Sequence, residues 1–316
     1  MCTAITFGDR NRFFGRNLDL SYHYEEAVCI MPRSYPLKYR RLPSDHGHYA
    51  MLGMATVKDG YPLYYDGVNE HGLCIAALQF RNNAYLPQAA DGEMVAQFEL
   101  IPYLLTRCQS VREVRAALRA VRIADIPFDE GMPTAALHYM VADRAECIVI
   151  EPMKGGLHIE ENPLGVLTNN PPFPMQMHRL SSYLNLTAEM PSNRFSEEIE
   201  LTPDSHGMGA IGLPGDFSSG SRFVRAAFCK LNAREKADAS YNLRQCFHIL
   251  ASVAPIEGCV RTKDGDFRTQ YTSVIDTEAQ SYTYTTYDCG EEITHALSAY
   301  DLDSTALTVY PIFQKS

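Results

Sequence analysis

Positive charge is scarce in this sequence. Its 28 Lys and Arg face 38 Asp and Glu, which gives a net charge of −10 over 316 residues. Binding to the phosphate backbone of nucleic acids needs clustered cations, so this balance argues against a nucleic-acid partner. The sequence also has no apolar run near the roughly 20 residues of a membrane span. No basic segment followed by an apolar one marks a secretory signal.

The cysteines do not form a metal or disulfide pattern. There are nine of them, with no C-x-x-C pair and no Cys/His spacing typical of a zinc site. An odd number of unpatterned cysteines is typical of a reduced, cytoplasmic protein. The Gly- and Ser-rich stretch near residue 215 lacks the P-loop pattern, so it gives no sign of a phosphate-binding cofactor. We therefore expect a cytoplasmic protein without metal or cofactor and without a membrane association.

The predicted elements run as strands, helices, strands, helices and strands, without strict βαβ alternation. This order predicts an α+β fold in which helices cover antiparallel sheets, and no linker divides residues 1–316 into two domains. The first two strands flank a turn at 8–11 and should form a hairpin. Strands are expected at 1–7, 12–17, 51–56, 72–80, 137–141, 147–151, 156–160, 165–168, 269–275 and 281–287. Helices are expected at 95–108, 111–121 with Ser110 as its cap, 175–186, 222–231 and 241–253.

Residue 2 is a cysteine. If Met1 is removed, Cys2 carries a thiol and a free α-amine on the same carbon. An α-amine has an ordinary pKa of about 7.7–8.0, so it can accept a proton near neutral pH and activate the adjacent thiol. Taken alone, Cys2 is more simply explained as an ordinary residue that opens the first strand.

Four other residues could complete a site around this thiol. Arg16 could stabilise a thiolate, and Asp19 could hold an ammonium or orient the arginine. Asn169 follows a strand, where its side-chain amide could donate to a developing oxyanion. Arg222 at the start of a helix could supply a second cation. Each also has an ordinary explanation, such as a surface ion pair or a turn asparagine.

Six sequence blocks occur in a characteristic order: MCT, FGRNLDL, DGVNEHGL, GVLTNNP, LPGDFSSGSRFVR and TQYTS. Together they resemble the choloylglycine hydrolase family, which holds bile salt hydrolases and penicillin V acylases. The resemblance extends from Cys2 to about Tyr287. It implies the N-terminal-nucleophile hydrolase fold, a four-layer αββα sandwich with two antiparallel sheets, and a homotetramer. It also implies cleavage of amides of the form acyl–NH–R.

The resemblance assigns a role to each residue that matches a family motif. It implies that Cys2 is the nucleophile and that its own α-amine is the base. Arg16 matches the arginine beside the sulfur, and Asp19 matches the carboxylate that contacts the amino terminus. Asn169 matches the side-chain donor of the oxyanion hole, and Arg222 matches the second arginine of the site.

One catalytic position departs from the family pattern. Gln79 stands where bile salt hydrolases usually carry Asn and many penicillin V acylases carry Tyr. The family uses the backbone N–H of this residue as the other oxyanion donor. A backbone donor survives substitution, so the departure affects the predicted substrate more than the predicted chemistry.

The same comparison suggests an apolar pocket for the acyl part of the substrate, lined by Leu18, Phe128 and Met132. Lys58 and Tyr65 fall at positions that could narrow this pocket, or both could point to solvent. The expected substrates are conjugated bile salts, cleaved to glycine or taurine and a free bile acid. The alternatives are a penicillin V acylase, a broader N-acyl amidase such as one acting on acyl-homoserine lactones, or a scaffold without activity.

Overall fold

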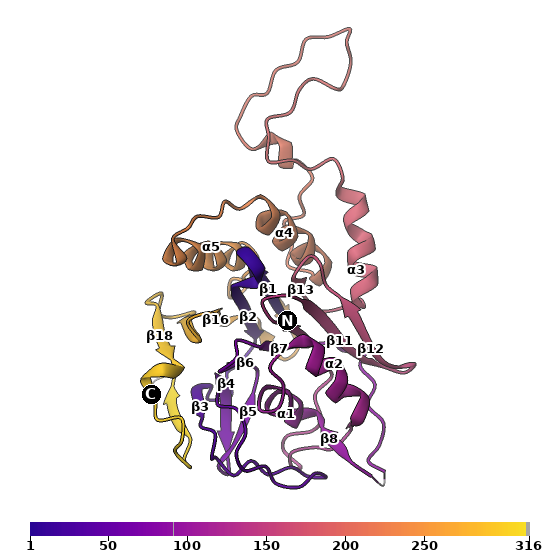
Figure 1. Cartoon of the computed structure of the whole chain (residues 1–316). Helices are drawn as coiled ribbons and strands as arrows, with labels where there is room; N and C mark the ends of the chain where they lie inside the picture. Colours follow the sequence, from indigo (N-terminus) through magenta and orange to yellow (C-terminus); the bar gives the residue numbers. More distant parts are fainter. Residues whose placement is uncertain (91, 314–316) are drawn as a thin grey trace.

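Two antiparallel sheets form the centre of the molecule (Figure 1). The computed structural model describes residues 1–90 and 92–313. The first sheet has six strands in the order β13-β1-β2-β16-β17-β18. Their bounds are Val166–Leu167, Cys2–Phe7, Phe13–Leu20, Arg268–Asp276, Ser281–Thr286 and Ile293–Ala296.

The second sheet has nine strands in the order β12-β11-β10-β7-β6-β4-β3-β19, with β5 paired to β4. In that order the bounds are Gly156–Glu161, Cys147–Met153, Leu137–Ala142, Cys74–Gln79, Asp66–Asn69, Met51–Lys58, Ala27–Met31 and Thr308–Pro311, and β5 is Tyr61–Tyr64. Two small ladders complete the β structure: β8 (Met94–Ala96) with β9 (Arg122–Ala124), and β14 (Arg261–Thr262) with β15 (Gly265–Asp266).

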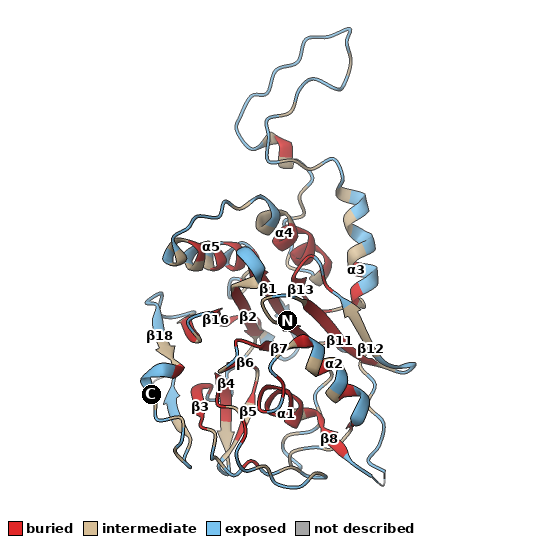
Figure 2. Cartoon of the chain, viewed as in Figure 1, coloured by how far each residue is buried: buried red, intermediate tan, exposed pale blue. Residues whose placement is uncertain are grey.

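Helices cover the outer face of each sheet. α4 (Ser219–Asn232) and α5 (Ala239–Ala251) pack on the six-stranded sheet, and α1 (Leu100–Leu105) packs on the nine-stranded one. α2 (Val111–Ala120) buries Val111, Val114 and Leu118 in the core beside α1. The helix faces that turn toward the sheets are the buried ones (Figure 2). These layers confirm the predicted αββα arrangement. One core fills the space between the sheets and continues under α4 and α5, and another lies under α1 and α2.

The predicted helix at 95–108 is wrong in its first half. Residues 94–96 form β8, which pairs in parallel with β9, and a 3-10 turn follows at Gln97–Glu99. The Glu99 carboxylate accepts the Ala96 N–H at 2.8 Å and so starts the helical segment late. The apolar pattern predicted a helix here because such a pattern cannot distinguish a short buried strand from a buried helical segment. Pairing with β9 decides in favour of the strand.

The other helices follow the predictions more closely. Ser110 caps α2 by accepting the Glu113 N–H, as predicted, although the Glu113 carboxylate accepts from Gln109 N–H instead of that of Ser110. α3 (Phe173–Arg179) gives way to a 3-10 turn at Leu180–Tyr183, so the predicted helix at 175–186 ends early as an α-helix. The segment between α3 and α4 extends away from the sandwich (Figure 1). Within the described ranges, no helix is long and apolar enough to cross a membrane.

Candidate active site

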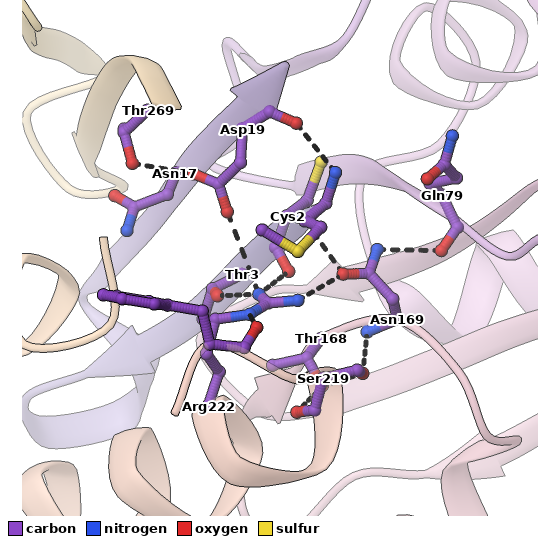
Figure 3. Close-up of polar contacts among 12 residues, drawn as sticks. Cys2, Thr3, Asn17, Asp19, Gln79, Thr168, Asn169, Ser219, Arg222 and Thr269 are labelled. Atoms are coloured by element: carbon purple, nitrogen blue, oxygen red, sulfur yellow. Dashed lines mark hydrogen bonds and ion pairs between the residues drawn. The ribbon is translucent and has the colours of Figure 1, made fainter. Parts of the chain in front are cut away.

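Cys2 opens β1, which lies between the edge strand β13 and β2 in the first sheet. Its side chain is only 4% exposed. Met1 is present, so the nitrogen of Cys2 is a peptide amide, and it donates to Asn169 Oδ1 at 3.0 Å. The ammonium of Met1 donates to the backbone oxygen of Asp19 at 2.7 Å. Removal of Met1 would convert the Cys2 amide into an amine in this same polar environment (Figure 3).

Arg16 on β2 contacts the sulfur directly, because its Nη2 lies 3.1 Å from Cys2 Sγ. Its Nη1 donates to the backbone oxygen of Tyr65 at 3.1 Å and to Asp66 Oδ2 at 3.4 Å. Burial alone would lower the pKa of this guanidinium, but the anionic and phenolic groups around it raise the pKa instead. Arg16 therefore stays charged at neutral pH. Sequence spacing alone favoured a surface ion pair, but the residue is fully buried.

Asp66 on β6 is a site residue that the sequence analysis missed. It is fully buried and accepts hydrogen bonds from the hydroxyls of Tyr271 (2.6 Å) and Tyr282 (2.7 Å). Burial raises the pKa of the Asp66 carboxyl, and Arg16 and the two tyrosines oppose this shift. The signal was present, since Asp66 begins the block DGVNEHGL and the two tyrosines lie in β16 and β17. The three residues meet only when β6 packs against the first sheet.

Asp19 lies at the far end of β2 and is fully buried. Its Oδ1 accepts from Thr269 Oγ1 at 2.7 Å, and its Oδ2 lies 3.9 Å from Arg222 Nη1. Burial raises the pKa of this carboxyl, whereas the charge of Arg222 lowers it. Among the residues that the structure describes, Oδ2 has no hydrogen-bond partner. A buried acceptor of this kind is suited to an additional cationic donor.

Arg222 reaches the site from the first turns of α4 and is also fully buried. Its Nη1 donates to the backbone oxygen of Cys2 at 2.6 Å and to Thr3 Oγ1 at 2.7 Å, and its Nη2 donates to Asn169 Oδ1 at 2.6 Å. Burial lowers the pKa of Arg222, and Asp19 partly compensates. The residue thus ties α4 to both the first strand and the loop after β13.

Asn169 and Gln79 bring two donors to the same place. Asn169 Nδ2 donates to the backbone oxygen of Gln79 at 2.8 Å (Figure 3). In an extended strand the N–H and C=O of one residue point to the same edge, so the Gln79 N–H also faces Asn169. Two neighbouring hydrogen bonds support this direction. The Phe80 N–H donates toward β10, whereas the Ala77 N–H, two residues before Gln79, donates to Tyr65 at the opposite edge of β7. An oxygen between these two donors would receive two hydrogen bonds.

A cavity of about 460 Å³ opens beside Cys2 and Gln79. Its wall includes all four residues predicted to bind substrate: Leu18, Tyr65, Phe128 and Met132. Tyr65 does not point to solvent, because its hydroxyl shares a hydrogen bond with Thr56 Oγ1 at 2.8 Å. Lys58 lies outside the wall and pairs with Asp129 at 2.5 Å. The cavity is therefore apolar over much of its wall and polar where it meets the sulfur.

The described residues contain no group of three His, Cys, Asp or Glu side chains placed to hold a metal ion. The predicted catalytic residues Cys2, Arg16, Asp19, Asn169 and Arg222 form one contact network, and Gln79 adjoins it. This arrangement supplies a thiol, a cation beside the sulfur and two convergent donors. It can support attack of a thiolate on a carbonyl carbon with stabilisation of the resulting oxyanion.

Comparison with known proteins agrees with this chemistry. Residues 2–310 match the family model for linear amide C–N hydrolases of the choloylglycine hydrolase family. A bile salt hydrolase/transferase of Lactiplantibacillus plantarum is 46% identical over 314 residues, which cover 99% of this chain and 97% of that protein. A bile salt hydrolase/transferase of Clostridium perfringens is 33% identical, with 98% and 96% covered.

Solved structures show the same fold. A variant of conjugated bile acid hydrolase from Clostridium perfringens superposes with a TM-score of 0.91 at 32% identity, covering 98% of this chain and 96% of that one. Penicillin V acylase from Agrobacterium tumefaciens, at 19% identity, shares the fold with a TM-score of 0.75 over 98% of this chain and 90% of its own. The predicted N-terminal-nucleophile hydrolase fold is confirmed. The chain belongs to the choloylglycine hydrolase family of linear amide C–N hydrolases.

Proposed function

We propose that this protein hydrolyses the amide bond of conjugated bile salts and releases glycine or taurine and a free bile acid. The observation that carries the proposal is the convergence of Cys2 Sγ, Arg16 and the two donors of Asn169 and Gln79 at one end of a largely apolar cavity. A steroid acid offers mostly apolar surface, and its burial in such a cavity supplies binding energy. The full-length relatives named as bile salt hydrolases support this substrate class.

The nucleophile in this proposal is Cys2 after removal of Met1. Its sulfur attacks the amide carbonyl and passes its proton to the α-amine of the same residue. Arg16, 3.1 Å from the sulfur, stabilises the anionic form of the thiol. The oxyanion of the tetrahedral intermediate accepts from Asn169 Nδ2 and the Gln79 N–H.

The ammonium then needs a counter-charge, and Asp19 offers its unpartnered Oδ2. The ammonium protonates the leaving nitrogen as the C–N bond breaks, which releases glycine or taurine and leaves a thioester on Cys2. A water molecule gives a proton to the regenerated amine and attacks the thioester carbonyl. Collapse of the second intermediate breaks the C–S bond, the ammonium returns its proton to the leaving sulfur, and the free bile acid is released. Arg222 holds the Cys2 carbonyl and Asn169 Oδ1 throughout.

The test is a comparison of kcat/KM for glycocholate and penicillin V with the purified, reduced protein. We expect a large preference for glycocholate. Cys2→Ala should abolish turnover of both substrates, whereas Cys246→Ala, at a buried cysteine in α5, should retain it. A preference for penicillin V would contradict the assignment of bile salts as the substrate but would be compatible with the mechanism. Turnover by Cys2→Ala would overturn the mechanism.

The homotetramer and the cytoplasmic location expected from the sequence stay predictions. Analytical ultracentrifugation of the purified protein would measure whether it is a tetramer. The single-domain organisation is part of the same proposal, and a single cooperative unfolding transition seen by two independent probes would support it.

A further inference from the structure

We propose that Arg81, held in place by the side chain of Gln79, binds the anionic end of the leaving amine. The site would then select amides whose amine part carries a carboxylate or sulfonate. This inference rests on the proposed function, because it concerns the glycine or taurine part of the same substrate. It assigns a role to the one catalytic position that departs from the family pattern.

The first observation is a fixed guanidinium at the end of β7. The Gln79 amide finds partners when its oxygen faces Arg81, and it then accepts from Arg81 Nε at 2.9 Å and from Nη2 at 3.2 Å. The backbone oxygen of Arg81 accepts from Asn170 Nδ2 at 2.5 Å. The arginine is thus held at its side chain and its main chain. A guanidinium has five N–H donors, so three remain available to a ligand.

The second observation is the charge balance at the cavity. Arg16 and Arg222 each lie near a buried carboxylate, and Lys58 pairs with Asp129. Arg81 lies in the cavity wall, and within residues 1–90 and 92–313 no carboxylate forms an ion pair with it. Its charge is therefore not neutralised by the protein. An anionic substrate group that enters the cavity meets this cation.

The third observation is the position of Arg81 relative to the reacting bond. Gln79, the last residue of β7, contributes the oxyanion donor through its backbone. Arg81 opens the turn that follows, and its guanidinium lies against the Gln79 side chain in the wall of the same cavity. The oxyanion donors bind the oxygen of the scissile carbonyl group, and the leaving nitrogen is bonded to the carbon of that group. In a glycine or taurine conjugate, only one or two carbons separate that nitrogen from the anion. Leu18, Phe128 and Met132 carry no charge that could serve the anion instead.

These observations explain what glutamine adds at position 79. An asparagine there would be one methylene shorter, and the bidentate contact to Nε and Nη2 depends on the reach of the glutamine amide. The N–H of Gln79 would serve the oxyanion, while its side chain would orient the cation that recognises the leaving group. Gln79 would thus contribute both to oxyanion stabilisation and to selection of the leaving amine.

The experiment compares three substrates that share the cholyl group: glycocholate, taurocholate and the neutral cholylglycinamide. Arg81→Met keeps an unbranched apolar stem of similar length to the arginine stem but removes the guanidinium and its charge. We expect this variant to lose roughly 10-fold in kcat/KM for both anionic substrates, mainly through KM, and to change little for the glycinamide. Arg81→Lys should recover part of the loss. The control is Arg122→Met, at an exposed arginine of β9 outside this cavity, which should behave like the wild type.

Ionic strength provides a second measurement that does not depend on the stability of a variant. Because salt screens an accessible ion pair, the wild-type KM for glycocholate should rise with salt while that for the glycinamide stays level. Equal losses on charged and neutral amides in Arg81→Met, or a salt-independent KM in the wild type, would overturn the inference and leave the bile salt assignment intact. If the wild type fails to turn over any cholyl amide, the proposed function itself fails.

Discussion

The side chain of Asn169 has a catalytic role and a structural role, and its replacement by alanine should affect kcat and stability in ways that can be measured separately. In the proposed mechanism Nδ2 donates to the oxyanion, a charge that exists only after the sulfur has attacked. Loss of one such donor typically lowers kcat by about 100–1000-fold, which corresponds to roughly 3–4 kcal/mol of transition-state stabilisation. Because the donor acts on the transition state, we expect KM to change little.

The same variant also removes hydrogen bonds that hold the site together. Asn169 Oδ1 accepts from Arg222 Nη2 at 2.6 Å and from the Cys2 nitrogen at 3.0 Å, in a side chain that is 8% exposed. A buried charged donor left without its partner costs about 1–3 kcal/mol of stability or more. Asn169→Ala should therefore also unfold at lower urea concentration than the wild type.

A matched variant shows whether the lost activity is merely lost stability. Asn17 is another buried asparagine, and its side chain donates to the Leu250 backbone oxygen and accepts from Thr272 Oγ1, both at 2.8 Å. It makes no hydrogen bond to Cys2, Arg222 or Gln79 among the contacts described. Asn17→Ala should lose similar stability and keep most of its kcat. The reasoning is refuted if Asn169→Ala keeps a kcat within a few-fold of the wild type, or if Asn17→Ala loses as much.

Three further variants test separate parts of the structure. In Asp19→Asn the α-amine of Cys2 loses a neighbouring negative charge, and loss of an anionic neighbour disfavours the ammonium form, so the acid limb of kcat/KM should move to lower pH in a profile between about pH 4.5 and 8.5; a move to higher pH would contradict the assignment. Tyr282→Phe removes a 2.7 Å bond to the buried Asp66 carboxylate, and urea unfolding should show a loss of about 1.5–3 kcal/mol. Burial lowers the pKa of Lys230 to about 8 from an ordinary 10.5, so the unfolded chain binds more protons between these values and stability should rise with pH there. Lys230→Met should flatten that rise in urea titrations from pH 7 to about 10.5, and a slope equal to that of the wild type would contradict the lowered pKa of Lys230.

Sequence alone predicted the layered fold and most strands, because alternating and continuous apolar runs carry that information. It missed short segments such as β3, β5 and β6, whose few residues give no usable period. It also predicted a helix where β8 forms, since the partner strand β9 lies 26 residues further along the chain. Pairings of that kind are tertiary and leave little trace in a local pattern.

The site was more predictable by resemblance than by spacing. Arg16 and Arg222 each had an ordinary surface explanation, and Cys2 could simply have opened a strand. Only the folded chain places all three in full or nearly full burial. Asp66 remained unrecognised because its partners Tyr271 and Tyr282 come from strands some 200 residues away. The Gln79–Arg81 contact was invisible for a different reason, since two polar residues at the end of a strand are ordinary turn composition.

The central claim is that the free α-amine of Cys2 acts as the base for its own thiol. With Met1 in place, the Cys2 nitrogen is an amide that donates to Asn169 Oδ1 and cannot accept a proton. The most direct test is kcat for glycocholate of two forms of the chain, one that begins at Cys2 and one that retains Met1. Both can come from one preparation made without methionine aminopeptidase, half of it then treated with the enzyme, with intact mass verifying each N-terminus. The account predicts that the Met1 form is at least about 100-fold slower, whereas equal kcat values would contradict it.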